Sequence, residues 1–306
     1  MPTNAPRIVN AMSVDVEDYF HVAALAQSID RSSWNDREYR AEENTHRLLD
    51  LFEASNIKAT FFVLGWVARR SPQLIREIHD RGHEVASHGM SHLLVYNQTP
   101  QEFTAETIES KSLLEDIIGA PVLGYRASTY SITRRSLWAL DILREAGFLY
   151  DSSIFPIRHD MYGIPDAPHE PGHFDTPKGA TIVEFPMSTA PMLGFTLPVS
   201  GGGYFRILPY WLTNAGLRKL NDQLARPFIF YLHPWEVDPA QPRVQTGLKS
   251  RLRHYTNLHR TEARLKRLIG DFSFAPVREV LGIRKLLVEE PGGWRAANPD
   301  PATSTQ

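Results

Sequence analysis

Polar side chains of the types that bind metals and transfer protons follow several short apolar runs of this sequence. The runs have the composition of buried strands and occur in the stretches SVDVED, EVASHGMSH, VLGYRAS and FIFYLHP. The polar residues where these runs end are Asp15, Glu17, Asp18, His88, His92, Arg126 and His233. In an α/β barrel the active site forms from the carboxyl ends of the strands and the loops that follow them. The pattern therefore predicts a single metal-assisted catalytic centre.

The histidines provide candidate metal ligands. Three pairs with His-x-x-x-His spacing occur among 12 histidines: His79 with His83, His88 with His92, and His169 with His173. The first pair lies between a helix end and a strand start, and the last lies in a loop rich in Pro and Gly, so both are interpreted as structural or solvated. Only His88 and His92 directly follow a strand. Because the chain has no cysteine, a transition metal must use histidine and carboxylate ligands, which suit zinc and related divalent ions.

The acidic cluster after the first strand offers both a ligand and a base. Asp15 and Glu17 lie on the same side of an ideal strand, because side chains alternate between its two faces. Asp18 lies beyond the expected end of the strand. Asp15 is then the base that accepts a proton from water, and Glu17 is the ligand. A turn that brings Asp18 to the metal instead is an alternative that the spacing leaves open.

Strands and helices alternate along most of the chain, which indicates βαβ units and a mainly parallel sheet. Strands are expected at 8–16, 59–65, 84–87 and 122–125, in TIVEF and in PFIFYLHP. Helices are expected at 42–55, between Pro72 and Gly82, and at 100–118, 133–146 and 209–224. The proline-rich stretch 154–205 is expected to be a long, mostly irregular excursion.

Length and composition favour one catalytic domain. The chain has 306 residues, of which 42% are hydrophobic, enough for one α/β barrel. We expect a domain over 1–285 that includes a basic, amphipathic helical appendage at about 242–270, and a disordered tail over 286–306. The 33 basic and 35 acidic residues argue against a nucleic-acid binder with a large cationic surface.

The N-terminal residues do not resemble a signal peptide, and no apolar run of about 18 residues is present to span a membrane. A cytoplasmic location without an integral membrane segment is therefore expected. The sequence does not indicate an oligomeric state.

These motifs resemble those of the polysaccharide deacetylases of carbohydrate esterase family four, which have a NodB-homology domain. SHGMSH matches the two-histidine metal motif of that family, and SVDVED is similar to its first acidic motif, which more often has two adjacent aspartates. YRASTY, YDSS and YLHP resemble the third, fourth and fifth motifs, with Ser128 in place of the usual proline. The resemblance covers about residues 8–281. HPWE and the C-terminal R-H-Y-x-N-L-x-R resemble the deacetylases associated with exosortase and exopolysaccharide loci.

The resemblance implies a distorted (β/α) barrel of about seven strands with a C-terminal helical extension. It also implies a divalent metal, with zinc first and Co²⁺, Ni²⁺ or Mn²⁺ as alternatives, and an N-acetylated glycan as substrate. The carried-over roles are Asp15 as base, Arg126 as its partner, His233 as general acid, Asp151 as the residue that orients His233, the Tyr130 backbone amide as an oxyanion donor, and Leu232 as part of the acetyl pocket. Trp235 is a candidate for stacking on a sugar.

The expected reaction is therefore hydrolysis of an N-acetyl group on an amino sugar of a polysaccharide or its lipid-linked precursor. Hydrolysis of another carbon–nitrogen bond, as in a deformylase or a cyclic amidase, and a catalytically silent glycan-binding protein are the alternatives. A glycosidase would also use paired carboxylates, but it has no need of the histidine pair.

Overall fold

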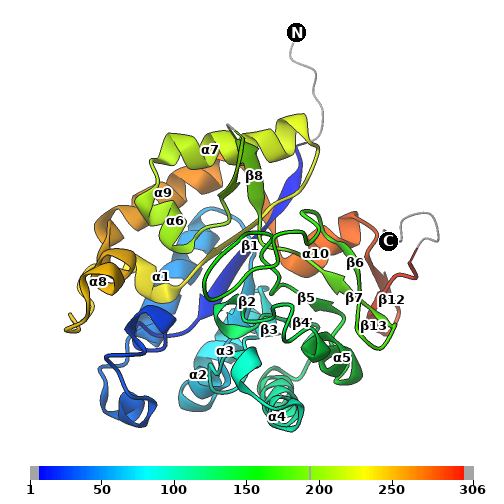
Figure 1. Cartoon of the computed structure of the whole chain (residues 1–306), viewed down its shortest axis with the longest axis horizontal. Helices are drawn as coiled ribbons and strands as arrows, with labels where there is room; N and C mark the ends of the chain where they lie inside the picture. Colours follow the sequence, from blue (N-terminus) through cyan, green and yellow to red (C-terminus); the bar gives the residue numbers. More distant parts are fainter. Residues whose placement is uncertain (1–6, 193, 300–306) are drawn as a thin grey trace.

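The computed structural model describes residues 7–192 and 194–299, which are built around one mixed sheet (Figure 1). In this part of the chain the sheet has nine strands in the order β10-β1-β2-β3-β4-β5-β7-β6, and β11 also pairs with β1. Its strands are β1 (Val9–Val16), β2 (Thr60–Val63), β3 (Glu84–Ser87), β4 (Gly124–Tyr125), β5 (Tyr150–Asp151), β6 (Gly172–Asp175), β7 (Thr181–Glu184), β10 (Ile229–Leu232) and β11 (Ser273–Ala275). All neighbours are parallel except β6, which is antiparallel to β7. The predicted parallel α/β fold is therefore confirmed.

Helices connect the parallel strands and cover the outside of the sheet. They are α1 (Ala41–Ala54), α2 (Gly65–Arg70), α3 (Pro72–Asp80), α4 (Pro100–Ile118), α5 (Trp138–Glu145), α6 (Gly202–Ile207), α7 (Tyr210–Arg218), α8 (Leu248–Tyr255), α9 (Leu258–Asp271) and α10 (Val277–Ile283). The alternation of side chains along β1 divides its residues between two apolar clusters. Val14 packs in the cluster that contains Leu48 and Ile75 of the helices, whereas Ala11 belongs to the cluster inside the curved sheet.

The sheet is strongly curved. In a flat sheet Arg126, which follows β4, would lie about 19 Å from β10, because four strand spacings separate the two strands. Its guanidinium instead lies 6.0 Å from the ring centre of Tyr231 in β10 and 2.6 Å from a carboxylate oxygen of Asp15 in β1. Side chains from opposite parts of the sheet therefore meet in its interior, as in a barrel.

The parallel strands β10 and β7, at opposite ends of the parallel part of the strand order, are linked by irregular backbone. The Tyr231 amide of β10 donates to the Ser200 carbonyl at 2.7 Å, and the Ile229 amide donates to the Ser188 hydroxyl at 2.8 Å. Ser188 follows β7 after a short connection. The barrel is therefore distorted at this seam, next to the hairpin of β8 (Thr189–Met192) and β9 (Phe195–Pro198).

Several boundaries differ from the sequence expectations. The expected helix over 133–146 begins only at Trp138, because the preceding residues form turns around Ser136. The stretch 154–205 contains β6, β7 and the β8–β9 hairpin, so it is more regular than its prolines indicated. The helical appendage is present as α8 and α9.

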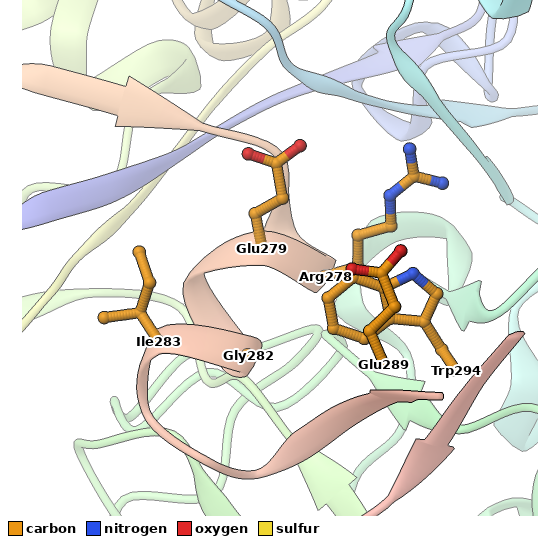
Figure 2. A pocket seen from close by; sticks show the side chains of 6 residues that line it. All are labelled: Arg278, Glu279, Gly282, Ile283, Glu289 and Trp294. Atoms are coloured by element: carbon orange, nitrogen blue, oxygen red, sulfur yellow. The ribbon is translucent and has the colours of Figure 1, made fainter. Parts of the chain in front are cut away.

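The predicted disordered tail over 286–306 is wrong for its described part. Residues Leu287–Glu290 (β12) and Gly293–Ala296 (β13) pair as an antiparallel hairpin, whereas residues 300–306 lie outside the described chain. Figure 2 shows Trp294 of this hairpin beside Gly282 of α10, and a Cβ on Gly282 would lie 3.0 Å from the indole ring. The tryptophan thus docks the hairpin on the domain.

None of the helices in residues 7–192 and 194–299 combines the length and the apolar character that crossing a bilayer requires.

Replacing Gly201 by alanine is expected to destabilise the seam of the barrel. Gly201 has a φ of 126°, and a Cβ there would lie 2.0 Å from the Tyr231 carbonyl oxygen. Strained backbone alone costs about 1–3 kcal/mol, and the clash adds to this. Urea denaturation should therefore show a loss of about 2–4 kcal/mol in the free energy of unfolding.

The matched control is Gly270→Ala in α9, where a Cβ meets no atom within 4 Å. This change should stabilise the helix by up to about 1 kcal/mol. A Gly201→Ala protein as stable as wild type would contradict the described seam.

Candidate active site

The polar residues singled out in the sequence emerge at one end of the sheet. Asp15 lies near the end of β1, and Glu17 and Asp18 follow that strand. His88 directly follows β3, Arg126 follows β4 and His233 follows β10. These are the carboxyl ends of parallel strands, where the expectation from the sequence placed them.

Glu17, His88 and His92 form a buried group that fits a metal ion. One potential ligand atom from each residue lies within 4.8 Å of the others. A carboxylate oxygen of Glu17, Oε2, lies 2.6 Å from Nε2 of His92, but no N–H or O–H group of the described residues is aligned to donate to it. A buried carboxylate oxygen without a donor is costly, and a bound cation would satisfy it.

His88 is held in a form suited to metal binding. Nδ1 of His88 donates to the Arg126 carbonyl at 2.8 Å, which leaves Nε2 as the ligand atom. Burial lowers the pKa of His88 to about 4, so its ring is neutral at pH 7. Burial alone would raise the pKa of Glu17, but His92 and His233 outweigh it and lower this pKa well below its usual range. Two imidazoles and one carboxylate form a donor set of the catalytic zinc type, with positions left for water and substrate.

Asp18 has a structural role in this arrangement. Its Oδ1 accepts from the amide of Tyr19 at 2.8 Å, and its Oδ2 accepts from the amides of Arg40 and Ala41 at 2.6 and 2.7 Å. Because α1 begins at Ala41, this carboxylate stabilises the N-terminus of that helix. Of the two carboxylates left open by the sequence, the structure therefore places Glu17 in the metal group, and the assignment of Asp18 as a ligand is corrected.

Asp15 is paired with Arg126 in the barrel interior. Its Oδ1 accepts from Nη1 of Arg126 at 2.6 Å, and the same nitrogen donates to the Ser13 hydroxyl at 3.0 Å. Arg126 is fully buried, and its remaining donors bond the carbonyl and the hydroxyl of Ser152, each at 3.1 Å. The second oxygen of Asp15, Oδ2, lies 3.9 Å from Nε2 of His233. One oxygen of Asp15 is thus fixed while the other faces the candidate acid.

His233 faces the carboxylates of Asp15 and Glu17 and remains partly accessible, with 17% of its side chain exposed. Its Nε2 lies 3.5 Å from Oε1 of Glu17, and its Nδ1 donates to Oε1 of Glu236 at 2.8 Å. Burial opposes protonation, but the carboxylates of Glu236, Glu17 and Asp15 outweigh it and raise the pKa of His233 to about 9. His233 can therefore hold a proton on Nε2 at neutral pH.

The expected pairing of Asp151 with His233 is wrong. The oxygens of Asp151 accept from the hydroxyl and the amide of Ser153 at 2.6 and 3.2 Å, and Asp151 lies opposite Glu184 in the β5–β7 register. Burial raises the pKa of both carboxyl groups, which favours a shared proton between them. Glu236 takes the place at His233 that was expected for Asp151.

The three predicted substrate-binding residues also differ from expectation. The Tyr130 amide donates to the Ala127 carbonyl at 3.0 Å, so it is not free to bind an oxyanion. Leu232 packs in the cluster between sheet and helices, and Tyr231, its neighbour on the opposite face, points into the barrel. Trp235 is only 5% exposed and stacks with the imidazoles of His233 and His254, so its ring is not available to a sugar.

Glu236 is the site residue that the sequence analysis missed. It lies three positions after His233 in the short turn Pro234–Val237, and its Oε1 also accepts from the His233 amide at 3.1 Å. Glutamate at this position of a turn that starts with proline is a recognised capping pattern. The stretch HPWE therefore carried a local signal for this contact.

Two family models match this chain. Residues 27–150 match polysaccharide deacetylase, and residues 152–282 match a domain of unknown function, DUF3473. His88, His92 and Arg126 lie in the first region and His233 with Glu236 in the second, whereas Asp15 and Glu17 precede both. The candidate site thus combines residues from all three parts.

Comparison with individual proteins gives the same fold. A peptidoglycan-N-acetylglucosamine deacetylase of Bacillus cereus is 30% identical over 79 residues, which are 26% of this chain and 37% of that protein, so this chain covers little more than a third of its length. A Mycobacterium smegmatis structure assigned to the polysaccharide deacetylases aligns over 98% of this chain and 97% of its own, with a TM-score of 0.60 and 18% identity. The allantoinase PuuE aligns over 91% and 93%, with a TM-score of 0.56 and 17% identity. Both structural likenesses concern the fold alone.

Substitutions at the two adjacent carboxylates, Glu17 and Asp18, should affect different properties of the protein. Glu17→Gln should lower zinc affinity by about 100-fold or more, since loss of even an outer partner of a metal ligand costs 10–100-fold. Asp18→Asn should leave zinc affinity nearly unchanged and lower the free energy of unfolding by about 0.5–2 kcal/mol through the weakened helix cap. Competition titration and urea denaturation measure the two quantities. Loss of zinc binding in Asp18→Asn, with normal binding in Glu17→Gln, would reverse the assignment.

Proposed function

We propose that this chain, whose residues 27–150 belong to the polysaccharide deacetylase family, hydrolyses the N-acetyl group of an amino sugar within a glycan. One observation carries the proposal: Asp15 and His233 face each other beside Glu17, His88 and His92, with Asp15 Oδ2 lying 3.9 Å from His233 Nε2. A base and a protonated acid at a candidate metal group are what amide hydrolysis requires.

Glu17, His88 and His92 would hold a divalent metal, with zinc preferred for this donor set. Such an ion supplies a Lewis acid that polarises the amide carbonyl and makes water more acidic. Glu17 is ionised and His88 is neutral at pH 7, which are the protonation states that metal binding needs.

Asp15 is the proposed general base. Arg126 holds one of its oxygens, so that the other can accept a proton from the attacking water without rotation of the carboxylate. The Ser13 hydroxyl and Ser152 complete the contacts of the guanidinium and fix it in place. The reaction therefore starts from a base of defined orientation.

His233 is the proposed general acid. Without a proton, the sugar nitrogen would have to leave as a strongly basic anion. The leaving nitrogen must therefore receive a proton when the carbon–nitrogen bond breaks. Nδ1 of His233 is committed to Glu236, which leaves the proton on Nε2 facing Asp15 and Glu17. The hydrogen bond from Nδ1 to Glu236 is the largest of the contacts that raise the pKa of His233, and it favours the protonated ring. This acid also favours an amide substrate over an activated ester, which can be cleaved without it.

The similarity to a peptidoglycan-N-acetylglucosamine deacetylase supports an N-acetylated amino sugar as the substrate class. Release of acetate separates this function from the other hydrolyses that the same groups could catalyse. Deformylation would release formate, and opening of a cyclic amide would give one ring-opened product that carries both the new carboxylate and the new amine. A binding protein would show saturable binding without turnover.

Zinc-loaded Asp15→Asn and His233→Ala should each lose about 10²–10⁴-fold in kcat for acetate release from N-acetylglucosamine oligomers, the usual contribution of a general acid or base. Zinc content, measured by elemental analysis, should stay equal to wild type, which separates proton transfer from metal loss. His173→Ala is the matched control, because His173 lies in β6 away from the site, and its activity should be unchanged. Full activity in either zinc-loaded site variant would exclude the assigned role of that residue.

A further inference from the structure

The glutamate that holds His233 is itself held by a buried arginine. Oε2 of Glu236 accepts from Nε of Arg206 at 2.6 Å, and neither side chain is more than 2% exposed. Glu236 therefore bridges two residues, with one oxygen on His233 and the other on Arg206. Burial would raise the pKa of Glu236, but Arg206 and His233 outweigh it and lower this pKa to about 2, so the bridge is ionised.

Arg206 anchors this bridge to the helical appendage. Its Nη1 donates to the carbonyls of His254 and Thr256 at 2.7 and 3.1 Å, and its Nη2 donates to the Arg253 carbonyl at 2.9 Å. These carbonyls lie at the end of α8, where they have no helical partner. The guanidinium thus satisfies the C-terminal carbonyls of α8 and the carboxylate of Glu236 at once.

The appendage also holds the backbone of Arg206. Asn257 donates through its side-chain amide to the Arg206 carbonyl at 2.8 Å, and Arg264 of α9 donates to the carbonyls of Phe205, Arg206 and Leu208 at 2.7–3.1 Å. Figure 1 shows α6, α8 and α9 together on one side of the sheet. Residues of the R-H-Y-x-N-L sequence thus contact both the side chain and the backbone carbonyl of Arg206 in α6.

A stack of rings restrains His233 from the same side. The imidazole lies 5.0 Å from the Trp235 ring with an interplanar angle of 23°, and Trp235 lies 4.3 Å from the His254 ring with an angle of 18°. Nε2 of His254 and Oε1 of Gln241 are 2.6 Å apart. Burial lowers the pKa of His254 to about 3, so this ring is neutral and does not repel Arg206.

We propose that Glu236 and Arg206 are positioning residues for the general acid, and that the α6–α9 part of the DUF3473 region serves to orient His233. The inference rests on the proposed function, which makes His233 the acid. Glu236 fixes Nδ1 as the donor to a carboxylate and so directs Nε2 toward Asp15 and Glu17. Arg206 fixes Glu236, and the end of α8 fixes Arg206. Asp151 does not take this place, because Nδ1 of His233 bonds Glu236 whereas the oxygens of Asp151 bond Ser153.

The test compares two substrates of zinc-loaded full-length protein. An N-acetylglucosamine oligomer needs a proton on its leaving nitrogen, whereas 4-nitrophenyl acetate releases a stable phenolate and does not. Glu236→Gln, which keeps the shape of the side chain, should lower kcat/KM for the oligomer by about 100-fold and leave ester hydrolysis nearly unchanged. Arg206→Lys should also lower kcat/KM for the oligomer relative to kcat/KM for the ester, but by a smaller factor. One ammonium cannot bond the carboxylate of Glu236 and three carbonyls together.

Asp238→Asn is the matched control. Asp238 is buried two positions after Glu236 and forms a comparable ion pair, with 2.5 Å from Oδ2 to Nε of Arg40, but it does not contact His233. Asp238→Asn should therefore change hydrolysis of the oligomer and of the ester by the same factor. If Glu236→Gln also lowers kcat/KM for the oligomer and for the ester by the same factor, the residue has only a structural role and the inference is overturned.

A spectroscopic measurement separates this inference from the proposed function. In protein with ¹⁵N-labelled histidine, the Nδ1 signal of His233, assigned through its absence in His233→Ala, should shift in Glu236→Gln because a neutral amide replaces the carboxylate. If wild type releases no acetate from N-acetylated glycans, the proposed function fails, and this shift still decides the orientation. An unchanged Nδ1 signal would overturn the inference whatever the activity.

Discussion

The buried ion pair between Asp15 and Arg126 is the contact around which the site is built. Arg126 bonds Asp15 of β1 and Ser152 after β5 through its side chain, and it accepts the Nδ1 proton of His88 through its carbonyl. Only a strongly curved sheet lets one residue contact Asp15, Ser152 and His88 together. Removal of one partner from a buried ion pair leaves an uncompensated charge and costs about 3–5 kcal/mol. The curvature of the barrel, the proposed base and a candidate metal ligand are therefore coupled through one residue.

The site depends on three parts of the chain that lie far apart in the sequence, and the candidate metal group itself draws on two of them. The first strand provides Asp15 and Glu17, the region matched to polysaccharide deacetylases provides His88, His92 and Arg126, and the DUF3473 region provides His233. Because β1 pairs with β2 of the first region and with β10 and β11 of the DUF3473 region, the two regions share one sheet. We infer that the acid and the base reach their places only when the whole sheet has formed.

Residue pattern was a good guide wherever the relevant contact was local or periodic. The alternation of strands and helices predicted the parallel sheet, and the positions of Asp15, His88, Arg126 and His233 after apolar runs predicted that they share one edge. Glu236 was also within reach, because its contact with His233 is a capping pattern three residues long. The family resemblance instead pointed to the aspartate of YDSS, Asp151, as the acidic partner.

The errors arose where tertiary packing decides between adjacent positions. Side chains in a strand alternate, so an error of one residue exchanges the interior Tyr231 for the outward Leu232. Asp18 is a cap for a helix that begins more than 20 residues later, which its own surroundings do not reveal. Asp151 faces Glu184 because of the β5–β7 register, and such pairings between distant strands cannot be derived from local spacing.

The most direct test of this account is anomalous scattering from crystals of the zinc-loaded protein, recorded on both sides of the zinc absorption edge. The account predicts one strong peak within bonding distance of Glu17, His88 and His92, with Asp18 still bonded to the amides of Arg40 and Ala41 and Asp15 still paired with Arg126. A peak bound by Asp18 in place of Glu17 would refute the ligand assignment, and the absence of any peak at His88 and His92 would contradict the metal-assisted site itself.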